Sequence, residues 1–191
     1  SDDVKTALVR KWMDKLWKDG VSAVADISND ASSFPVKQTS PVYTRTFLEV
    51  FGTEPQDCDA VMASVRELKK TADEYGIDAA PTPHSCYTMS PELLSASSAA
   101  GLESGFLSYH SQESQEEEDL LISGTGAMAE NRKRAGMSTP PVTGESSLKY
   151  FIDRLAAAKP APYREHVLLV HNVTLAQADI DAARSVMENV Y

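Results

Sequence analysis

Signals that begin and end helices recur along the whole chain, and they constrain the fold more than any other feature of the sequence. Three segments place Ser or Thr three residues before Glu or Gln, the capping-box pattern of a helix N-terminus: Thr53–Gln56, Ser114–Glu117 and Thr174–Gln177. Glycines that can end a helix follow several apolar segments, at Gly20, Gly52, Gly76 and Gly101. This punctuation predicts a succession of short helices.

The apolar residues between these signals repeat at helical spacing. The clearest case is the segment from Thr53 to Gly76, in which one face carries Cys58, Val61, Met62, Val65, Leu68, Ala72 and Tyr75. The run Val167–Val170 fits a buried strand or a buried helix equally well. We assign it to a helix, because no second strand signal offers it a partner. We therefore predict an all-α fold, a single bundle of about seven or eight helices joined by short loops.

The chain length of 191 residues matches one domain at roughly 100–200 residues per domain. We predict a single all-α domain that covers residues 1–191. The segment 136–144 contains Pro140-Pro141 between two glycines. This composition is typical of a linker, and it predicts an internal hinge or long loop there.

The composition excludes several classes of protein. Lys and Arg number 18 against 28 Asp and Glu, a net charge of −10, which argues against a globally basic nucleic-acid binder. No apolar run approaches the roughly 20 residues that span a bilayer, so we expect no membrane association. The sequence starts without a basic and apolar secretory signal, and Cys58 and Cys86 are its only cysteines. We expect an intracellular location, cytoplasmic or within an assembled particle.

Cys86 is the one candidate nucleophile. It precedes Tyr87 and a helix start, and a helix N-terminus favours the thiolate. A cysteine followed by an aromatic residue, with histidine far downstream, resembles the pattern of papain-like thiol proteases, although Ser85 stands where that family has glycine. The resemblance implies attack by Cys86 on an acyl carbon with His166 or His171 as base. The alternative is an unreactive cysteine in a half-buried loop, which we prefer.

Metal and cofactor sites are not expected from the sequence. His166 and His171 are five residues apart, which places them on different faces of a helix or a strand. His84 and Cys86 can share one side of an extended segment, but two ligands do not make a zinc site. We therefore predict no metal ligands and no cofactor.

The run Arg132, Lys133 and Arg134 ends a segment that begins with acidic residues. Acid at the start and base at the end of a helix complement its dipole, which accounts for both runs without a ligand. Contact with nucleic acid or an acidic partner through these three residues is the alternative, and we do not favour it.

Trp12 and Trp17 lie about 140° apart on the first predicted helix, so both cannot face one core centre. Aromatic residues at the margin of an apolar face are typical of partner contacts, and the terminal helix ends in a second such pair, Val190 and Tyr191. Our leading hypothesis is a non-catalytic helical assembly or interaction subunit, structural, coat-, nucleoprotein- or linker-like, that contacts other protein subunits or further copies of itself. The alternatives are the small cysteine hydrolase and local nucleic-acid contact.

Overall fold

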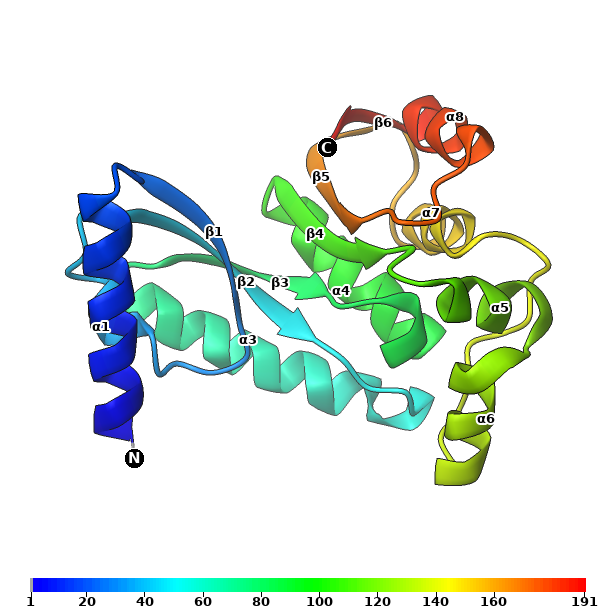
Figure 1. Ribbon diagram of the computed structural model, residues 1–191, viewed down its shortest axis with the longest axis horizontal. Helices are drawn as coiled ribbons and strands as arrows, with labels where there is room; N and C mark the ends of the chain where they lie inside the picture. The colour runs from blue at the N-terminus through cyan, green and yellow to red at the C-terminus, as the bar shows by residue number, and fades with distance from the viewer. Residues whose placement is uncertain (1) are drawn as a thin grey trace. The chain divides into compact units, whose positions relative to one another are not determined.

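The computed structural model describes residues 2–191, and it is an α/β protein with two parallel three-stranded sheets (Figure 1). The helices are α1 (Asp2–Lys18), α2 (Phe34–Lys37), α3 (Cys58–Glu74), α4 (Pro91–Glu103), α5 (Gln115–Ser123), α6 (Gly126–Ala135), α7 (Ser147–Ala158) and α8 (Gln177–Val186). The strands are β1 (Ala23–Ser28), β2 (Tyr43–Val50), β3 (Asp78–Pro83), β4 (Phe106–Ser111), β5 (Tyr163–His171) and β6 (Met187–Val190). The predicted all-α bundle is therefore wrong.

The chain divides into two compact units. The first comprises residues up to Glu49 together with Ala63–Pro81, and the second comprises Val50–Met62 together with Thr82–Tyr191. The prediction of a single domain with a hinge at 136–144 stays a prediction. In the structure, residues 137–146 form a loop within the second unit.

The first unit holds the sheet β1-β2-β3, in which β1 and β2 run parallel. The helix α1 packs through buried Met13 against Val36 and Val42. The buried Lys37 ammonium is paired with Asp26, which compensates for its removal from water. The long helix predicted between Thr53 and Gly76 is present as α3.

The second unit holds the sheet β4-β5-β6, whose strands are all parallel. Because parallel neighbours require a crossover, helices separate the strands along the chain: α5 to α7 lie between β4 and β5, and α8 lies between β5 and β6. The helix α7 contacts both α4 and α8. Tyr109 of β4 stacks on Phe151 of α7 with ring centroids 3.7 Å apart, and both side chains are fully buried.

The all-α prediction failed because the strands lack the pattern that identifies strands in a sequence. The run Val167–Val170 lies in the second half of β5, with β4 and β6 as the partners whose signal seemed to be missing. Burial alternates along this run, but the partly exposed Leu168 and Val170 are as apolar as the buried Val167 and Leu169, so the sequence shows no alternation of polar and apolar residues. Strand β3 reads Asp-Ala-Ala-Pro-Thr-Pro, and its two prolines are typical of a loop. Strand β6 continues directly from α8, so its residues, up to Val190, were predicted as the end of the terminal helix.

Within residues 2–191, no helix combines the length and the apolar character that a membrane span needs.

Candidate functional site

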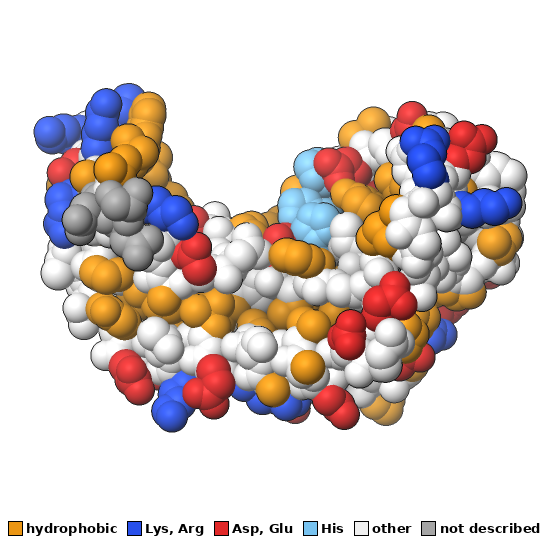
Figure 2. Space-filling view, turned by 90° about the horizontal axis from the view of Figure 1, so that it is seen from below, with side chains coloured by type: hydrophobic (Ala, Val, Ile, Leu, Met, Phe, Trp, Pro, Cys, Tyr) orange, Lys and Arg blue, Asp and Glu red, His pale blue; other side chains and the backbone are white. Residues whose placement is uncertain are grey.

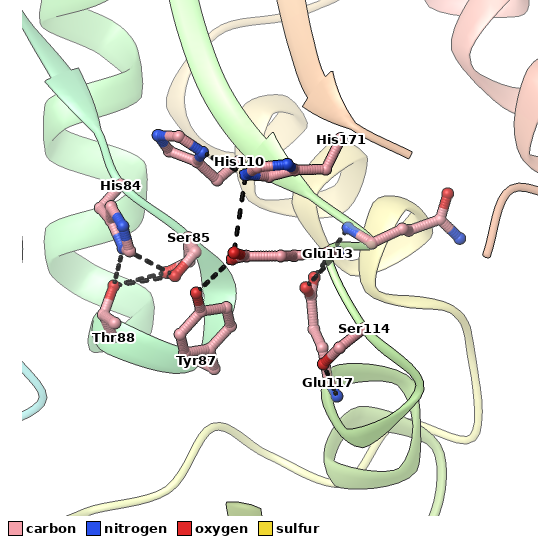
Figure 3. A network of polar contacts seen from close by, with 10 residues as sticks. His84, Ser85, Tyr87, Thr88, His110, Glu113, Ser114, Glu117 and His171 are labelled. Atoms are coloured by element: carbon pink, nitrogen blue, oxygen red, sulfur yellow. Dashed lines mark hydrogen bonds and ion pairs between the residues drawn. The ribbon is translucent and has the colours of Figure 1, made fainter. Parts of the chain in front are cut away.

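A cluster of polar side chains lies where β4, β5 and the segment after β3 end (Figure 3). Parallel register pairs Ser111 with His171, so the last residues of β4 and β5 lie at the same edge of the sheet. The segment after β3 extends this edge, because the His110 amide donates to the His84 carbonyl at 2.9 Å. The carboxyl ends of parallel strands are where α/β proteins bind ligands.

Two imidazole rings and one carboxylate converge at this edge. His110 Nδ1 lies 3.0 Å from His171 Nε2, and His171 Nε2 lies 3.7 Å from Glu113 Oε1. Figure 2 shows histidine side chains gathered in one surface patch beside an acidic side chain. The side chains of His171 and Glu113 are 34% and 41% exposed, so a small molecule can reach them.

The Glu113 carboxylate is held by a neighbour on the other side. The Tyr87 hydroxyl donates to Glu113 Oε2 at 2.6 Å, which leaves Oε1 directed at His171. This hydrogen bond, followed by the electrostatic effect of the nearby histidines, lowers the pKa of Glu113 and keeps it ionised. Burial and the same hydrogen bond raise the pKa of Tyr87, so it remains a donor.

His84 forms the third corner of the cluster. Its Nδ1 contacts Thr88 Oγ1 at 2.8 Å and Ser85 Oγ at 2.9 Å, so two hydroxyl groups fix the plane of the ring. The His84 ring lies 4.9 Å from the His110 ring and meets the Tyr87 ring edge-on at 5.9 Å.

His110 and His171 can offer two nitrogen ligands to one divalent metal ion, whereas the Glu113 carboxylate lies near His171 and not within ligand distance of both rings. Zinc binds imidazole nitrogen at about 2.0–2.1 Å and carboxylate oxygen at about 2.0–2.2 Å. Two nitrogens 3.0 Å apart can therefore bind one ion with an angle of about 90° between them. The other coordination positions of such an ion are open to water, and Glu113 lies beside them. No metal site was expected here from the sequence.

The predicted nucleophile Cys86 lies in the interior. Its side chain is 0% exposed, and Sγ donates to Glu117 Oε1 at 3.4 Å. Burial, with the adjacent Glu117 charge, raises the pKa of the Cys86 thiol well above its usual value. The two histidines predicted as alternative bases lie in different places. His171 lies in the cluster, whereas His166 Nδ1 contacts the Tyr191 hydroxyl at 2.8 Å.

The basic residues at the end of α6 differ in their exposure to solvent. Arg132 is buried, and its guanidinium donates to the Ser138 carbonyl at 2.5 Å, which ties α6 to the following loop. Burial lowers the pKa of Arg132. Lys133 and Arg134 are exposed. Contact with nucleic acid or an acidic partner through this run stays a prediction.

The residues predicted to contact a partner are accessible. Trp12 and Trp17 are 56% and 49% exposed on α1, and Tyr191 is 60% exposed after β6. Val190 is half-buried and lines, with Tyr191, a cavity of about 250 Å³ beside α8. Their role in protein contacts stays a prediction.

Three residues of the cluster, His84, His110 and Glu113, were not identified from the sequence. His110 ends the segment Leu102–His110, whose residue pattern does not decide between helix and strand, and Glu113 follows three positions later. The recognition of Phe106–Ser111 as a parallel strand would have placed both residues at its carboxyl end.

The fold is similar to that of a solved enzyme. The crystal structure of aminofutalosine deaminase from Helicobacter pylori matches with a TM-score of 0.77 and 22% sequence identity, over 97% of this chain and 45% of the deaminase chain. This chain therefore spans less than half the length of that protein, and the likeness shows the fold. No protein-family model and no curated protein sequence matches the chain.

These findings correct the functional prediction. The hypothesis of a non-catalytic helical assembly subunit depended on an all-α bundle, and the α/β fold shared with a deaminase overturns it. The same finding contradicts the alternative of a papain-like hydrolase, and the complete burial of Cys86 is consistent with this correction.

Proposed function

We propose that the second unit carries active-site residues of a metal-dependent hydrolase of the deaminase class. The observation that carries the proposal is the convergence of His110, His171 and Glu113 at the carboxyl ends of adjacent parallel strands. The similarity in fold to aminofutalosine deaminase supports the class of reaction. The residues proposed to bind the metal are His110 and His171, with Glu113 beside them.

Hydrolytic deamination replaces a carbon-bound amino group by oxygen from water and releases ammonia. A divalent metal at this site supplies a Lewis acid that lowers the pKa of water towards neutrality. Glu113 is ionised and its Oε1 lies 3.7 Å from His171 Nε2, so it can accept a proton from a water molecule beside His171 and return it to the departing nitrogen. Water adds to the carbon to form the new C–O bond, and the C–N bond then breaks. One proton of the water leaves on the nitrogen as part of ammonia, and the other is transferred to the remaining product as its C=O bond forms.

His84 and Tyr87 have supporting roles in this proposal. Tyr87 orients the Glu113 carboxylate through one oxygen and leaves the other available for proton transfer. The His84 ring, fixed by Ser85 and Thr88, forms a wall beside His110 that can contact the substrate.

Two measurements on the purified chain test the proposal. Calorimetric titration with Zn²⁺ is expected to give a single tight site that His110→Ala and His171→Ala each remove. His166→Ala is the matched control, because His166 lies on the same strand but contacts Tyr191, and it should bind zinc normally. With zinc present, ammonia release from aminofutalosine is expected and should be lost in Glu113→Gln. Zinc binding that survives both histidine substitutions, or no ammonia release, would reject the proposal.

Two earlier expectations remain part of the proposal. The sparse cysteine content, two residues in 191, supports an intracellular location. The exposed Trp12 and Trp17 support contact with another protein subunit. Sedimentation of the wild-type chain and of Trp12→Ser tests the second expectation, because a self-association that depends on α1 would be weakened by the substitution.

A further inference from the structure

The loops that carry the candidate site adopt an unusual backbone. Gln112, His171 and Asn172 are the non-glycine residues with positive φ among residues 2–191, at 51°, 79° and 53°. All three lie at the ends of β4 and β5, next to His110 and Glu113. A left-handed backbone at such residues is costly and persists only where the surroundings enforce it.

The two loops hold each other through their backbones. The Asn172 amide donates to the Ser111 carbonyl at 2.8 Å, and the Val173 amide donates to the Gln112 carbonyl at 2.8 Å. A change in the loop after β4 is therefore transmitted to the loop after β5, which carries His171.

A buried carboxylate accepts hydrogen bonds from the backbone of the loop after β4. Glu117 is 0% exposed, and its two oxygens accept hydrogen bonds from the Gln112 amide at 3.0 Å and the Glu113 amide at 2.8 Å. In an ordinary capping box, the acidic residue three positions into the helix returns to the N-cap amide. Here Ser114 is the N-cap, and Glu117 reaches beyond it to the two preceding residues. Figure 3 shows Glu117 bonded to the segment beside Glu113.

We infer that Glu117 is a positioning residue for the proposed metal site, which fixes Glu113 and the His110–His171 pair through the backbone between them. This inference rests on the proposed function. Glu117 is shielded from solvent by its own loop, so it contacts neither substrate nor ion. Outer partners of metal ligands commonly change metal affinity about 10–100-fold when they are replaced.

The next residue in α5 provides a matched control. Glu118 is 5% exposed, and its carboxylate accepts from the Ser147 amide and hydroxyl and from the side chains of Gln112 and Thr174. It therefore contacts the segments after β4 and β5 through side chains, without a bond to the backbone amides of residues 112 and 113. Substitution of either glutamate by glutamine removes one buried carboxylate from the same helix. A general loss of stability would affect both variants, whereas a loss of positioning is specific to Glu117.

The test compares zinc affinity and amide hydrogen exchange for wild type, Glu117→Gln and Glu118→Gln. The glutamine NH₂ group cannot accept, so one backbone amide loses its partner. Zinc affinity of Glu117→Gln should fall about 10-fold or more, while Glu118→Gln stays within about 3-fold of wild type. In the metal-free protein, the amides of Gln112 and Glu113 should exchange faster in Glu117→Gln alone.

Equal zinc affinity in wild type and Glu117→Gln, or equal losses in both variants, would overturn the inference and leave the proposed function intact. If wild type binds no zinc, the proposed function fails, and unchanged exchange at Gln112 and Glu113 would separately reject the positioning role. If Glu117→Gln does not fold, Glu117→Asp replaces it. That variant keeps the charge but is one methylene shorter, so the same loss of affinity is expected, and wild-type affinity would overturn the inference.

Discussion

Replacement of Tyr87 by phenylalanine removes one hydrogen bond from the candidate site and little else. The hydroxyl donates to Glu113 at 2.6 Å, while the ring packs edge-on against His84 and is retained in the variant. A hydrogen bond to a charged group contributes about 1.5–3 kcal/mol. Because the Glu113 side chain is 41% exposed, solvent screening reduces this contribution to about 1 kcal/mol. Because this bond is already present without metal, a loss of about 1 kcal/mol sets an upper limit of roughly fivefold on the weakening of zinc binding.

The same substitution has a defined effect on protonation. The Tyr87 hydrogen bond is the largest cause that lowers the pKa of Glu113, so Tyr87→Phe should raise that pKa. A carboxyl with a lowered folded-state pKa stabilises the protein above its unfolded-state pKa and loses that effect as the pH falls. The stability gap between wild type and Tyr87→Phe should therefore be largest near neutral pH and close on acidification through the pKa of Glu113.

Tyr43→Phe is the control for both measurements. The Tyr43 hydroxyl also donates to a carboxylate, that of Asp78, but in the first unit. Calorimetry with zinc and carbon-13 titration of the Glu113 carboxyl give the two readouts. The reasoning is refuted if Tyr87→Phe binds zinc as wild type does with an unchanged Glu113 pKa, or if Tyr43→Phe shows the same changes.

Two further predictions concern the folded chain. Under native conditions iodoacetamide should modify the partly exposed Cys58 and spare the buried Cys86, because the raised pKa of the Cys86 thiol disfavours the thiolate. Mass spectrometry measures the labelling of each cysteine, and rapid labelling of Cys86 in the folded chain would contradict its burial. Gly76→Ala should lose about 1–2 kcal/mol in chemical denaturation, because its φ is +66°. Gly124→Ala should lose more stability than Gly76→Ala, since the φ of Gly124 is +68° and a Cβ there would lie 2.7 Å from Val142 Cγ2. Equal losses would show that the Val142 side chain moves away at no measurable cost.

The helices could be predicted from the sequence because their signals are local. Ser90 and Ser146 cap α4 and α7 through their hydroxyl groups, as side chains of this type do at helix starts. The first predicted helix, which carries Trp12 and Trp17, is present as α1 (Asp2–Lys18). Caps and amphipathic spacing depend on neighbours within a few residues, so they can be recognised from the sequence alone.

The strands and the site depend on residues far apart in the chain. His110 and His171 are separated by 61 positions and meet only because β4 and β5 pair in register. Along the sequence His171 could be compared only with His166, five positions away, and that spacing excludes a shared face, whereas the contact of His171 is with His110 on the neighbouring strand. The capping pattern Ser114–Glu117 was recognised, but the side chain of Glu117 reaches the loop that carries the site, which no local pattern indicates.

X-ray absorption at the zinc edge of the purified chain, loaded with one equivalent of Zn²⁺, tests the central claim most directly. The account predicts imidazole scattering from two rings, with Zn–N distances of about 2.0–2.1 Å, that drops to one ring in His110→Ala and in His171→Ala. His166→Ala should give the wild-type spectrum. A zinc environment without histidine, or one that none of these substitutions changes, would contradict the assignment of His110 and His171 as metal ligands.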